Sequence, residues 1–278
     1  MEARADLHTH TTASDGTQTP TQVVEAARAA GLAAVGITDH DTIAGIEEAI
    51  EAGERLGVEV VPGVEITAMY GRNIEVHVLG YWIEHRDVRL REFLQTLVEA
   101  RFERARKMVD LLRQAGVRVE FDRVKEIAGG GAIGRPHVAR AICEAGAASS
   151  IDAAFGLYLR DGGPAYVPRH RVTPSEAVAV ILQAGGVPCC AHVAKLGRDE
   201  LVIDLMREGL RAIEVYHPDH SPVGTQFYRR FALARGLIAT GGSDAHFAHD
   251  ARHRPVGGTT VSYEVVTELK RAAGRVEV

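Results

Sequence analysis

Two blocks of the sequence alternate short apolar runs with segments of helical periodicity, and this rhythm constrains the fold more than any other feature. The first block covers residues 4–81 and the second covers residues 174–273. Such alternation is typical of βα units around a parallel sheet. Because both blocks supply units of similar size, we predict an α/β protein with a distorted (β/α)7 barrel.

The strand pattern gives about seven positions in this barrel, with a last strand and helix near residues 259–273. The strands are predicted at residues 4–8, 32–38, 58–64, 74–81, 187–192, 212–217 and 237–243. Between the blocks the chain is mostly helical and begins with an arginine-rich stretch, 88–116. We therefore predict a barrel domain of residues 1–84 and 169–278 and an inserted helical subdomain, residues 85–168, that caps the substrate.

Composition excludes several classes of protein. The 278 residues are 46% hydrophobic, as in a globular chain with a sizeable core. A net charge of −5 does not favour duplex DNA or anionic membranes as partners. The three cysteines form no disulfide framework, and no apolar run approaches the roughly 18 residues of a membrane span. We expect a cytoplasmic protein without an obligate protein partner.

Histidines and carboxylates gather at the predicted strand ends. His8 and His10 flank one residue of the first strand, so both rings lie on one face of an extended chain. Other strand ends carry His40, Glu65, His77, His192, Glu214, His217, Asp244 and His246, and Asp15 lies in a nearby loop. In a barrel these ends converge on one face. Without a positive charge between them these groups would repel or stay unpaired, so the sequence predicts a metal cluster.

Four motifs, in order along the chain, carry a resemblance to a known family. They are Asp6-Leu7-His8-Thr9-His10-Thr11 with Ser14-Asp15-Gly16, Ile37-Thr38-Asp39-His40-Asp41-Thr42, Gly63-Val64-Glu65-Ile66 and Gly242-Ser243-Asp244-Ala245-His246. The chain closely resembles the polymerase and histidinol phosphatase (PHP) family of metal-dependent phosphoesterases. Within it, the chain is similar to the branch of 3′,5′-nucleoside bisphosphate phosphatases and 5′-to-3′ exoribonucleases. The resemblance implies a PHP fold and hydrolysis of nucleoside 3′,5′-bisphosphates or 5′-phosphorylated short RNA by a metal-bridging hydroxide.

The resemblance also implies three divalent metal ions, which we expect to be Mn²⁺, with Fe²⁺ or Zn²⁺ as alternatives. The three ligand sets would be His8, His10, Glu65 and Asp244; then Glu65, His77 and His192; and then Asp15, His40 and His246. Two further residues are predicted to assist catalysis. Asp39 would orient a ligand or cap the following helix. His217 would bind phosphate or protonate the leaving oxygen, or would only bond the backbone at its strand end.

Basic residues of the predicted insertion form a candidate substrate site. Arg101 and Arg104 share a helix face, and Arg135 and His137 follow a glycine-rich segment at a predicted helix start. Over the barrel mouth these side chains would bind a substrate phosphate. The alternatives are a solvated basic face for the arginines and a plain hinge for the glycines. The roles of Tyr166, Arg169 and His170 stay open, and four histidines are interpreted as surface residues: His85, His220, His249 and His253.

Two other functions fit parts of the pattern. An amidohydrolase-type barrel also begins with a His-x-His strand, but its common two-metal form needs a carboxylated lysine on a strand. None of the four lysines lies in a predicted strand: Lys107, Lys125, Lys195 and Lys270. A non-catalytic PHP module that only binds its partner would tend to lose metal ligands, whereas all nine are present here.

Overall fold

The computed structural model of the protein describes residues 3–71, 74–168, 171–246 and 255–275. Arg169, His170, His249 and His253, for which the sequence suggests roles or surface positions, lie outside these ranges. No helix within these ranges is both long and apolar enough to cross a membrane.

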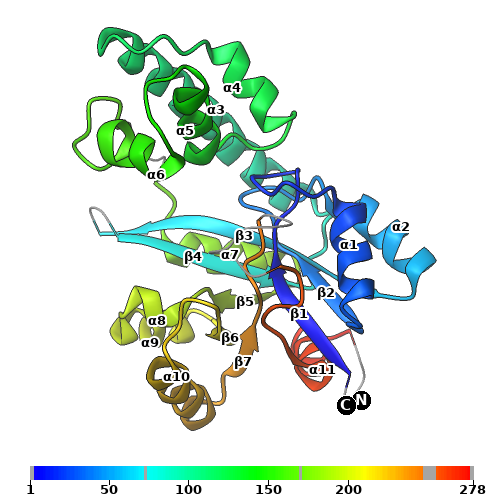
Figure 1. The fold of residues 1–278 in the computed structure, drawn as a ribbon. Helices are drawn as coiled ribbons and strands as arrows, with labels where there is room; N and C mark the ends of the chain where they lie inside the picture. The colour runs from blue at the N-terminus through cyan, green and yellow to red at the C-terminus, as the bar shows by residue number, and fades with distance from the viewer. Residues whose placement is uncertain (1–2, 72–73, 169–170, 247–254, 276–278) are drawn as a thin grey trace.

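One curved sheet forms the centre of the molecule, in the order β7-β6-β5-β4-β3-β2-β1-β8 (Figure 1). Its strands are β1 (Arg4–Thr9), β2 (Ala34–Ile37), β3 (Glu59–Tyr70), β4 (Ile74–Tyr81), β5 (Val187–Cys190), β6 (Ala212–Tyr216), β7 (Ile238–Gly241) and β8 (Val261–Ser262). The two-residue β8 pairs antiparallel to β1 at its beginning. The other strands correspond to the seven predicted positions.

The segment after β7 nearly closes the sheet into a barrel by returning to β1. The amide of Asp244 donates to the carbonyl of His8 at 2.9 Å, and the amide of His10 donates to the carbonyl of Ala245 at 3.0 Å. This approach requires a glycine at position 242, because a Cβ there would lie 2.3 Å from the backbone nitrogen of His8. The predicted α/β fold, a distorted barrel, is confirmed.

The predicted parallel arrangement is wrong at β4. This strand is antiparallel to both β3 and β5, whereas β1, β2 and β3 are parallel to one another and so are β5, β6 and β7. The connection from β3 to β4 spans only residues 71–73, which suits a hairpin and is too short for a parallel crossover. As a result, the first half of β4 lies at the same end of the barrel as the carboxyl ends of the parallel strands.

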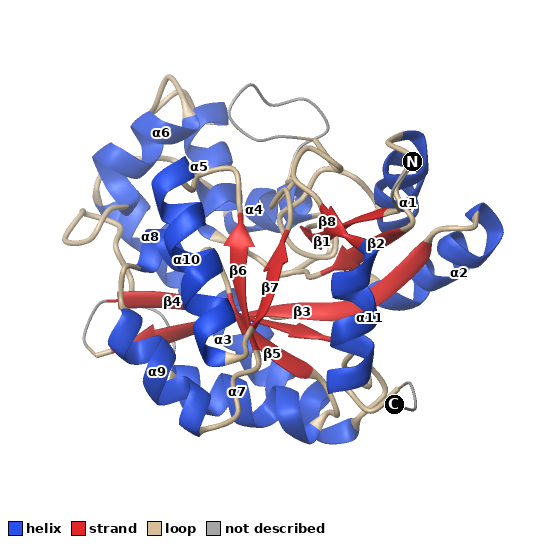
Figure 2. Cartoon of the chain, turned by 90° about the horizontal axis from the view of Figure 1, so that it is seen from below, coloured by secondary structure: helices blue, strands red, loops and turns tan. Residues whose placement is uncertain are grey.

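Helices surround the sheet (Figure 2). They are α1 (Pro20–Ala29), α2 (Ile46–Leu56), α7 (Pro174–Gln183), α8 (Val193–Leu196), α9 (Asp199–Arg207), α10 (Pro222–Arg235) and α11 (Tyr263–Ala272). A capping box at Thr19 starts α1. Helix α2 begins at Ile46, and Asp41, in the loop before it, adopts a left-handed backbone conformation with φ 54°.

The chain between β4 and β5 contains the helices α3 (Val88–Gln114), α4 (Phe121–Ala128), α5 (Arg135–Glu144), α6 (Ile151–Ala154) and the π-helix η1 (Phe155–Leu159). In Figure 1 they lie above the β3–β4 pair. The first turns of α3 contribute Leu90, Leu94 and Leu97 to the barrel core. From Ala105 to Ala165 the buried apolar residues form a separate cluster. The separate core thus begins at Ala105, some twenty residues after the predicted start of the insertion at residue 85, and the division into a barrel domain and an insertion stays a prediction.

Candidate active site

The nine predicted metal ligands converge at one end of the barrel. Ligand atoms lie within 4.8 Å of one another in three groups: His10, Asp15, His40 and His246; His8, His10 and Glu65; and His40, Glu65 and His77. The other two join them, since His192 Nε2 lies 3.3 Å from Glu65 and Asp244 Oδ1 lies 3.1 Å from His10 Nε2. The cluster therefore draws on β1, β3 and β4 and on the segments that follow β1, β2, β5 and β7.

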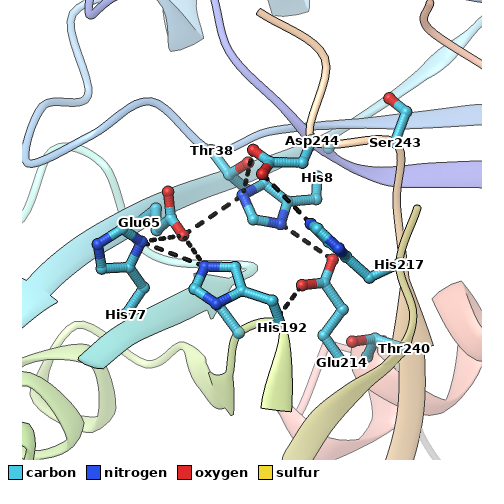
Figure 3. A network of polar contacts seen from close by, with 12 residues as sticks. His8, Thr38, Glu65, His77, His192, Glu214, His217, Thr240, Ser243 and Asp244 are labelled. Atoms are coloured by element: carbon cyan, nitrogen blue, oxygen red, sulfur yellow. Dashed lines mark hydrogen bonds and ion pairs between the residues drawn. The ribbon is translucent and has the colours of Figure 1, made fainter. Parts of the chain in front are cut away.

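Glu65, buried in the middle of β3, is the centre of this cluster (Figure 3). Its Oε1 lies 3.5 Å from His8 Nε2, 2.9 Å from His77 Nδ1 and 3.3 Å from His192 Nε2. Its Oε2 lies 3.4 Å from His10 Nε2 and 2.8 Å from His40 Nδ1. Because the two oxygens face different sets of imidazoles, Glu65 has the geometry of a carboxylate that bridges two cations.

Several of these buried polar atoms have no hydrogen-bond partner. They are His10 Nδ1, Asp15 Oδ1, His40 Nδ1 and Glu65 Oε2. His40 Nδ1 and Glu65 Oε2 are 2.8 Å apart without hydrogen-bond alignment. Buried polar atoms without partners are costly, and imidazole with carboxylate is a donor set for divalent transition metals. These residues therefore fit the metal ions that the sequence predicts.

The electrostatics of the cluster also call for positive charge. Burial alone would lower the pKa of His77, but Glu65 and Glu75 outweigh it and raise this pKa to about 9. Burial acts in the same way on His246, where Asp15 outweighs it and raises the pKa to about 10. Burial would raise the pKa of Glu65, yet the surrounding imidazoles hold it well below its usual range. The carboxylates thus favour protons on His77 and His246, whereas burial lowers the pKa of His10 and His192, and bound metal ions would supply positive charge to the whole cluster.

Two ligands lie on strained backbone. His192 has φ 31° and Asp244 has φ 53°, both in the left-handed region that is uncommon for residues other than glycine, although asparagine, aspartate and histidine adopt it more often than most. Each conformation costs on the order of 1–3 kcal/mol and persists only where the surroundings impose it. The backbone of His192 is held by Glu214, whose Oε2 accepts from the His192 amide at 2.7 Å.

Glu214 is a functional residue to which the sequence assigns no role, although it occupies a predicted strand end. It is fully buried in β6, and its Oε1 lies 2.9 Å from His8 Nδ1 (Figure 3). An imidazole that gives its Nδ1 proton to a carboxylate presents the Nε2 lone pair to a metal. Glu214 thus orients His8 and His192 together. The sequence does offer one signal for this role, namely a carboxylate two residues before Tyr216, near the end of a predicted strand.

We expect Glu214→Gln to lower metal affinity and kcat/KM by about 10- to 100-fold, as is typical when a partner of a metal ligand is lost. The amide has a single oxygen, so it can accept from the His192 amide or from His8 Nδ1 but not from both, and its NH2 group then faces the other donor. Metal titration of the apoprotein would measure the change. Unaltered affinity would show that Glu214 only fills space in the barrel.

Asp39, predicted to orient a ligand or to cap a helix, contacts the loop that carries the predicted ligand Asp15. Its carboxylate accepts hydrogen bonds from the Thr11 amide at 2.7 Å, the Thr11 hydroxyl at 2.8 Å and the Ser14 hydroxyl at 2.6 Å. Asp39 therefore fixes the loop between His10 and Asp15 and does not bond an imidazole in the described contacts. It does not cap α2 either, since the N-cap position there is Gly45.

His217 is bonded on both ring nitrogens. Its Nδ1 accepts from the Asp219 amide at 3.1 Å, so Nε2 carries the proton, which points to Asp244 Oδ2 at 3.2 Å. The side chain is 1% exposed. This geometry favours a role in positioning Asp244 over the predicted transfer of a proton to the leaving oxygen.

The basic residues of the insertion have protein partners. Arg101 is buried and bonds Asp41, with Nε at 2.6 Å from Oδ2, and its Nη2 donates to the Thr67 hydroxyl at 3.0 Å. Arg104 donates to the carbonyl of Val167 at 2.8 Å. Arg135 Nη2 lies 3.6 Å from Glu75 Oε2, and Glu75 Oε1 in turn contacts His77 at 2.9 Å. The alternative interpretation, in which these arginines form a solvated basic face, is therefore wrong for Arg101.

His137 and His220 also take part in local structure. His137 Nδ1 accepts from the Gly134 amide at 3.0 Å and closes the start of α5. His220, interpreted from the sequence as a surface residue, is partly buried, and its Nδ1 donates to the carbonyl of Val215 at 2.9 Å. The four lysines all lie on helices, namely α3, α4, α8 and α11. An amidohydrolase site with a strand lysine therefore does not fit this barrel.

A family model and known relatives agree with this geometry. Residues 6–153 match the PHP domain, and the chain belongs to the PHP family. It is 35% identical to the 3′,5′-nucleoside bisphosphate phosphatase of Chromobacterium violaceum, over 92% of each chain. It is 34% identical to the phosphoribosyl 1,2-cyclic phosphate 1,2-diphosphodiesterase of Eggerthella lenta, over 87% of this chain and 93% of the relative.

Two further relatives extend the comparison. The 5′-3′ exoribonuclease Rnm of Escherichia coli is 35% identical, over 87% of this chain and 84% of the relative. A solved structure from Bifidobacterium adolescentis, described as a metal-dependent phosphoesterase, superposes with a TM-score of 0.89. It is 31% identical and covers 99% of this chain, which in turn covers 97% of it. The chain is thus an enzyme of the metal-dependent phosphoesterase class.

Proposed function

We propose that this protein hydrolyses a terminal phosphate ester of a nucleotide, either a nucleoside 3′,5′-bisphosphate or a 5′-phosphorylated short RNA. The observation that carries the proposal is the cluster of nine predicted ligands, six of which line one cavity: His40, Glu65, His77, His192, Asp244 and His246. The relatives named as a bisphosphate phosphatase and as a 5′-3′ exoribonuclease support this substrate class. The relative named for a cyclic phosphate supplies an alternative substrate for the test.

Three divalent ions, with Mn²⁺ as the first candidate, would occupy the cluster in the predicted sets. One would be held by His8, His10, Glu65 and Asp244, one by Glu65, His77 and His192, and one by Asp15, His40 and His246. Bound divalent ions would supply Lewis acidity for the phosphoryl oxygens and would lower the pKa of water. The division of Glu65 between two sets of imidazoles fits this arrangement.

The chain's own residues orient these ligands and bind the substrate. Glu214 fixes the tautomer of His8, His217 directs Asp244, and Asp39 holds the loop that carries Asp15. On the insertion, Arg101, Arg104, Arg135 and His137 would bind the part of the substrate that extends from the metal cluster. If Gly134 carried a Cβ atom, that atom would lie 3.8 Å from Arg101 Nη1 and 3.8 Å from Asp15 Oδ2. The guanidinium of Arg101 is therefore close to the predicted ligand Asp15.

Product formation from a panel of substrates, measured as inorganic phosphate, released nucleotide or opened cyclic ester, tests the proposal. The panel contains adenosine 3′,5′-bisphosphate, AMP, histidinol phosphate, phosphoribosyl 1,2-cyclic phosphate and a 5′-phosphorylated oligoribonucleotide. We expect the highest kcat/KM for the bisphosphate or the RNA, because a second phosphate can bind the insertion's cations. A preference for histidinol phosphate or for the cyclic ester would contradict the proposal.

A further inference from the structure

The cavity beside the predicted metal ligands is lined by one lysine, Lys195, to which the proposed function assigns no role. The cavity measures about 270 Å³ and is lined on one side by the ligands His40, Glu65, His77 and His192. Glu75, Asp244 and His246 also line it, and Lys195 is the one lysine or arginine of the described residues that does so. Ligand sites for whole small molecules measure roughly 300–1,000 Å³. This cavity is therefore of a size for the phosphates of a nucleotide, with the base outside.

Lys195 is held near the metal cluster by rigid backbone. It lies three residues after the metal ligand His192, and its amide donates to the carbonyl of His192 at 2.9 Å. The amide of Ala194 donates to His220 Nε2 at 3.3 Å, which ties α8 to the end of β6. In Figure 1, α8 lies on the other side of the β3–β4 pair from the insertion. Lys195 and the insertion's arginines thus reach the site from different sides.

The ammonium group of Lys195 has a partner that a substrate can replace. Lys195 Nζ lies 2.9 Å from Asp219 Oδ2, and the two side chains are 48% and 54% exposed. Ion pairs with this exposure contribute little stability, because water solvates both charges well. A phosphate dianion in the cavity offers more charge than the single Asp219 carboxylate, and lysine binds phosphate as a point charge.

We propose that Lys195 binds the phosphate of the substrate that is not hydrolysed, and that Asp219 holds the ammonium group until substrate arrives. Lys195 would be a specificity-determining residue that selects substrates with two phosphates over simple monoesters. This role rests on the proposed function, since only a nucleotide with a second phosphate places an anion there. The proposal also predicts opposite effects of removing the two charges: loss of Lys195 should weaken binding of the second phosphate, and loss of the Asp219 carboxylate should strengthen it.

Three variants test the assignment with adenosine 3′,5′-bisphosphate and p-nitrophenyl phosphate as substrates. For Lys195→Ala we expect the ratio of the two kcat/KM values, bisphosphate over simple ester, to fall about 10- to 100-fold. Lys195→Arg should restore most of this ratio. Asp219→Asn should lower KM for the bisphosphate by about two- to fivefold, because it removes the competing carboxylate. Thermal stabilisation of each variant by the bisphosphate gives a readout that does not need turnover.

Arg198→Ala is the matched control. Arg198 lies three residues further on, its side chain is 49% exposed, and it pairs with Glu200 at 3.8 Å without lining the cavity. We expect wild-type values for it. If Lys195→Ala and Asp219→Asn both reduce activity on the two substrates equally, the pair only fastens α8 to the neighbouring loop and the assignment is wrong. An unchanged ratio in Lys195→Ala would also overturn it.

The same experiment separates this inference from the proposed function. If the wild-type enzyme prefers neither the bisphosphate nor the 5′-phosphorylated RNA over AMP, the proposed function fails and the second phosphate has no site. If the wild-type enzyme shows the preference and Lys195→Ala retains it, the proposed function stands and Lys195 is excluded as its cause. In that case the insertion's arginines alone would bind the second phosphate.

Discussion

Glu65→Gln is expected to lower kcat/KM on the order of 10³-fold or more and to reduce the metal content of the purified protein. Each oxygen of Glu65 faces its own group of imidazoles, and this one side chain belongs to two of the three groups of ligand atoms. The amide has nearly the same shape but no negative charge, and only one of its two ends can accept. Losing a single electrostatic stabiliser costs roughly 10²–10³-fold in other enzymes, and Glu65 would serve two cations. Metal content by mass spectrometry and steady-state kinetics measure the effect.

Glu59→Gln is the control for this prediction. Glu59 is the first residue of the same strand, but it lies away from the cluster, where it accepts from the Tyr263 hydroxyl at 2.6 Å and pairs with Lys270. We expect its metal content and kcat/KM to stay at wild-type values. Wild-type turnover in Glu65→Gln with full metal supplied would contradict the bridging geometry of Glu65.

The sequence located most of the cluster because its ligands obey a local rule. Histidines and carboxylates at strand ends do not contribute to an apolar core, so their presence there needs another reason. Any barrel also brings its strand ends together. The rule works for His8, His10 and Asp244 without knowledge of the pairing of the strands. It also works for His77, although β4 runs against the predicted direction, because the hairpin returns the start of β4 to the same end of the barrel.

The contacts that orient these ligands could not be predicted in the same way. Glu214 and His8 are 206 residues apart, and Asp39 reaches a loop 25–28 residues before it. Such pairs depend on the register between strands and on side-chain rotamers, which sequence periodicity does not specify. The contact of Arg101 with Asp41 could not be predicted for the same reason. The helix period places it on a face of α3, but only the fold shows that this face lies over Asp41.

Asp41→Asn is expected to lower the free energy of unfolding by about 3–5 kcal/mol, since it leaves Arg101 as a buried charge without a carboxylate. The side chains of Arg101 and Asp41 are only 12% and 4% exposed. Asparagine tolerates the left-handed backbone at this position, and its carbonyl oxygen can still accept from the Thr67 amide, which now lies 2.7 Å from Asp41 Oδ1. The change therefore isolates the loss of charge. Urea unfolding followed by the fluorescence of Trp82, the single tryptophan, measures it.

The double variant Asp41→Asn with Arg101→Met decides whether the effect comes from the ion pair. Replacing both partners of a buried pair by groups of similar volume is often neutral, whereas removing one partner leaves the other uncompensated. We therefore expect the double variant to be more stable than Asp41→Asn alone. If the two losses simply add, the charges are not coupled, and Asp41 stabilises the fold through its bond to Thr67. A positive coupling would show that the buried Arg101–Asp41 pair fastens the insertion to the barrel mouth, so that helix α3 keeps the basic side chains in place beside the metal cluster.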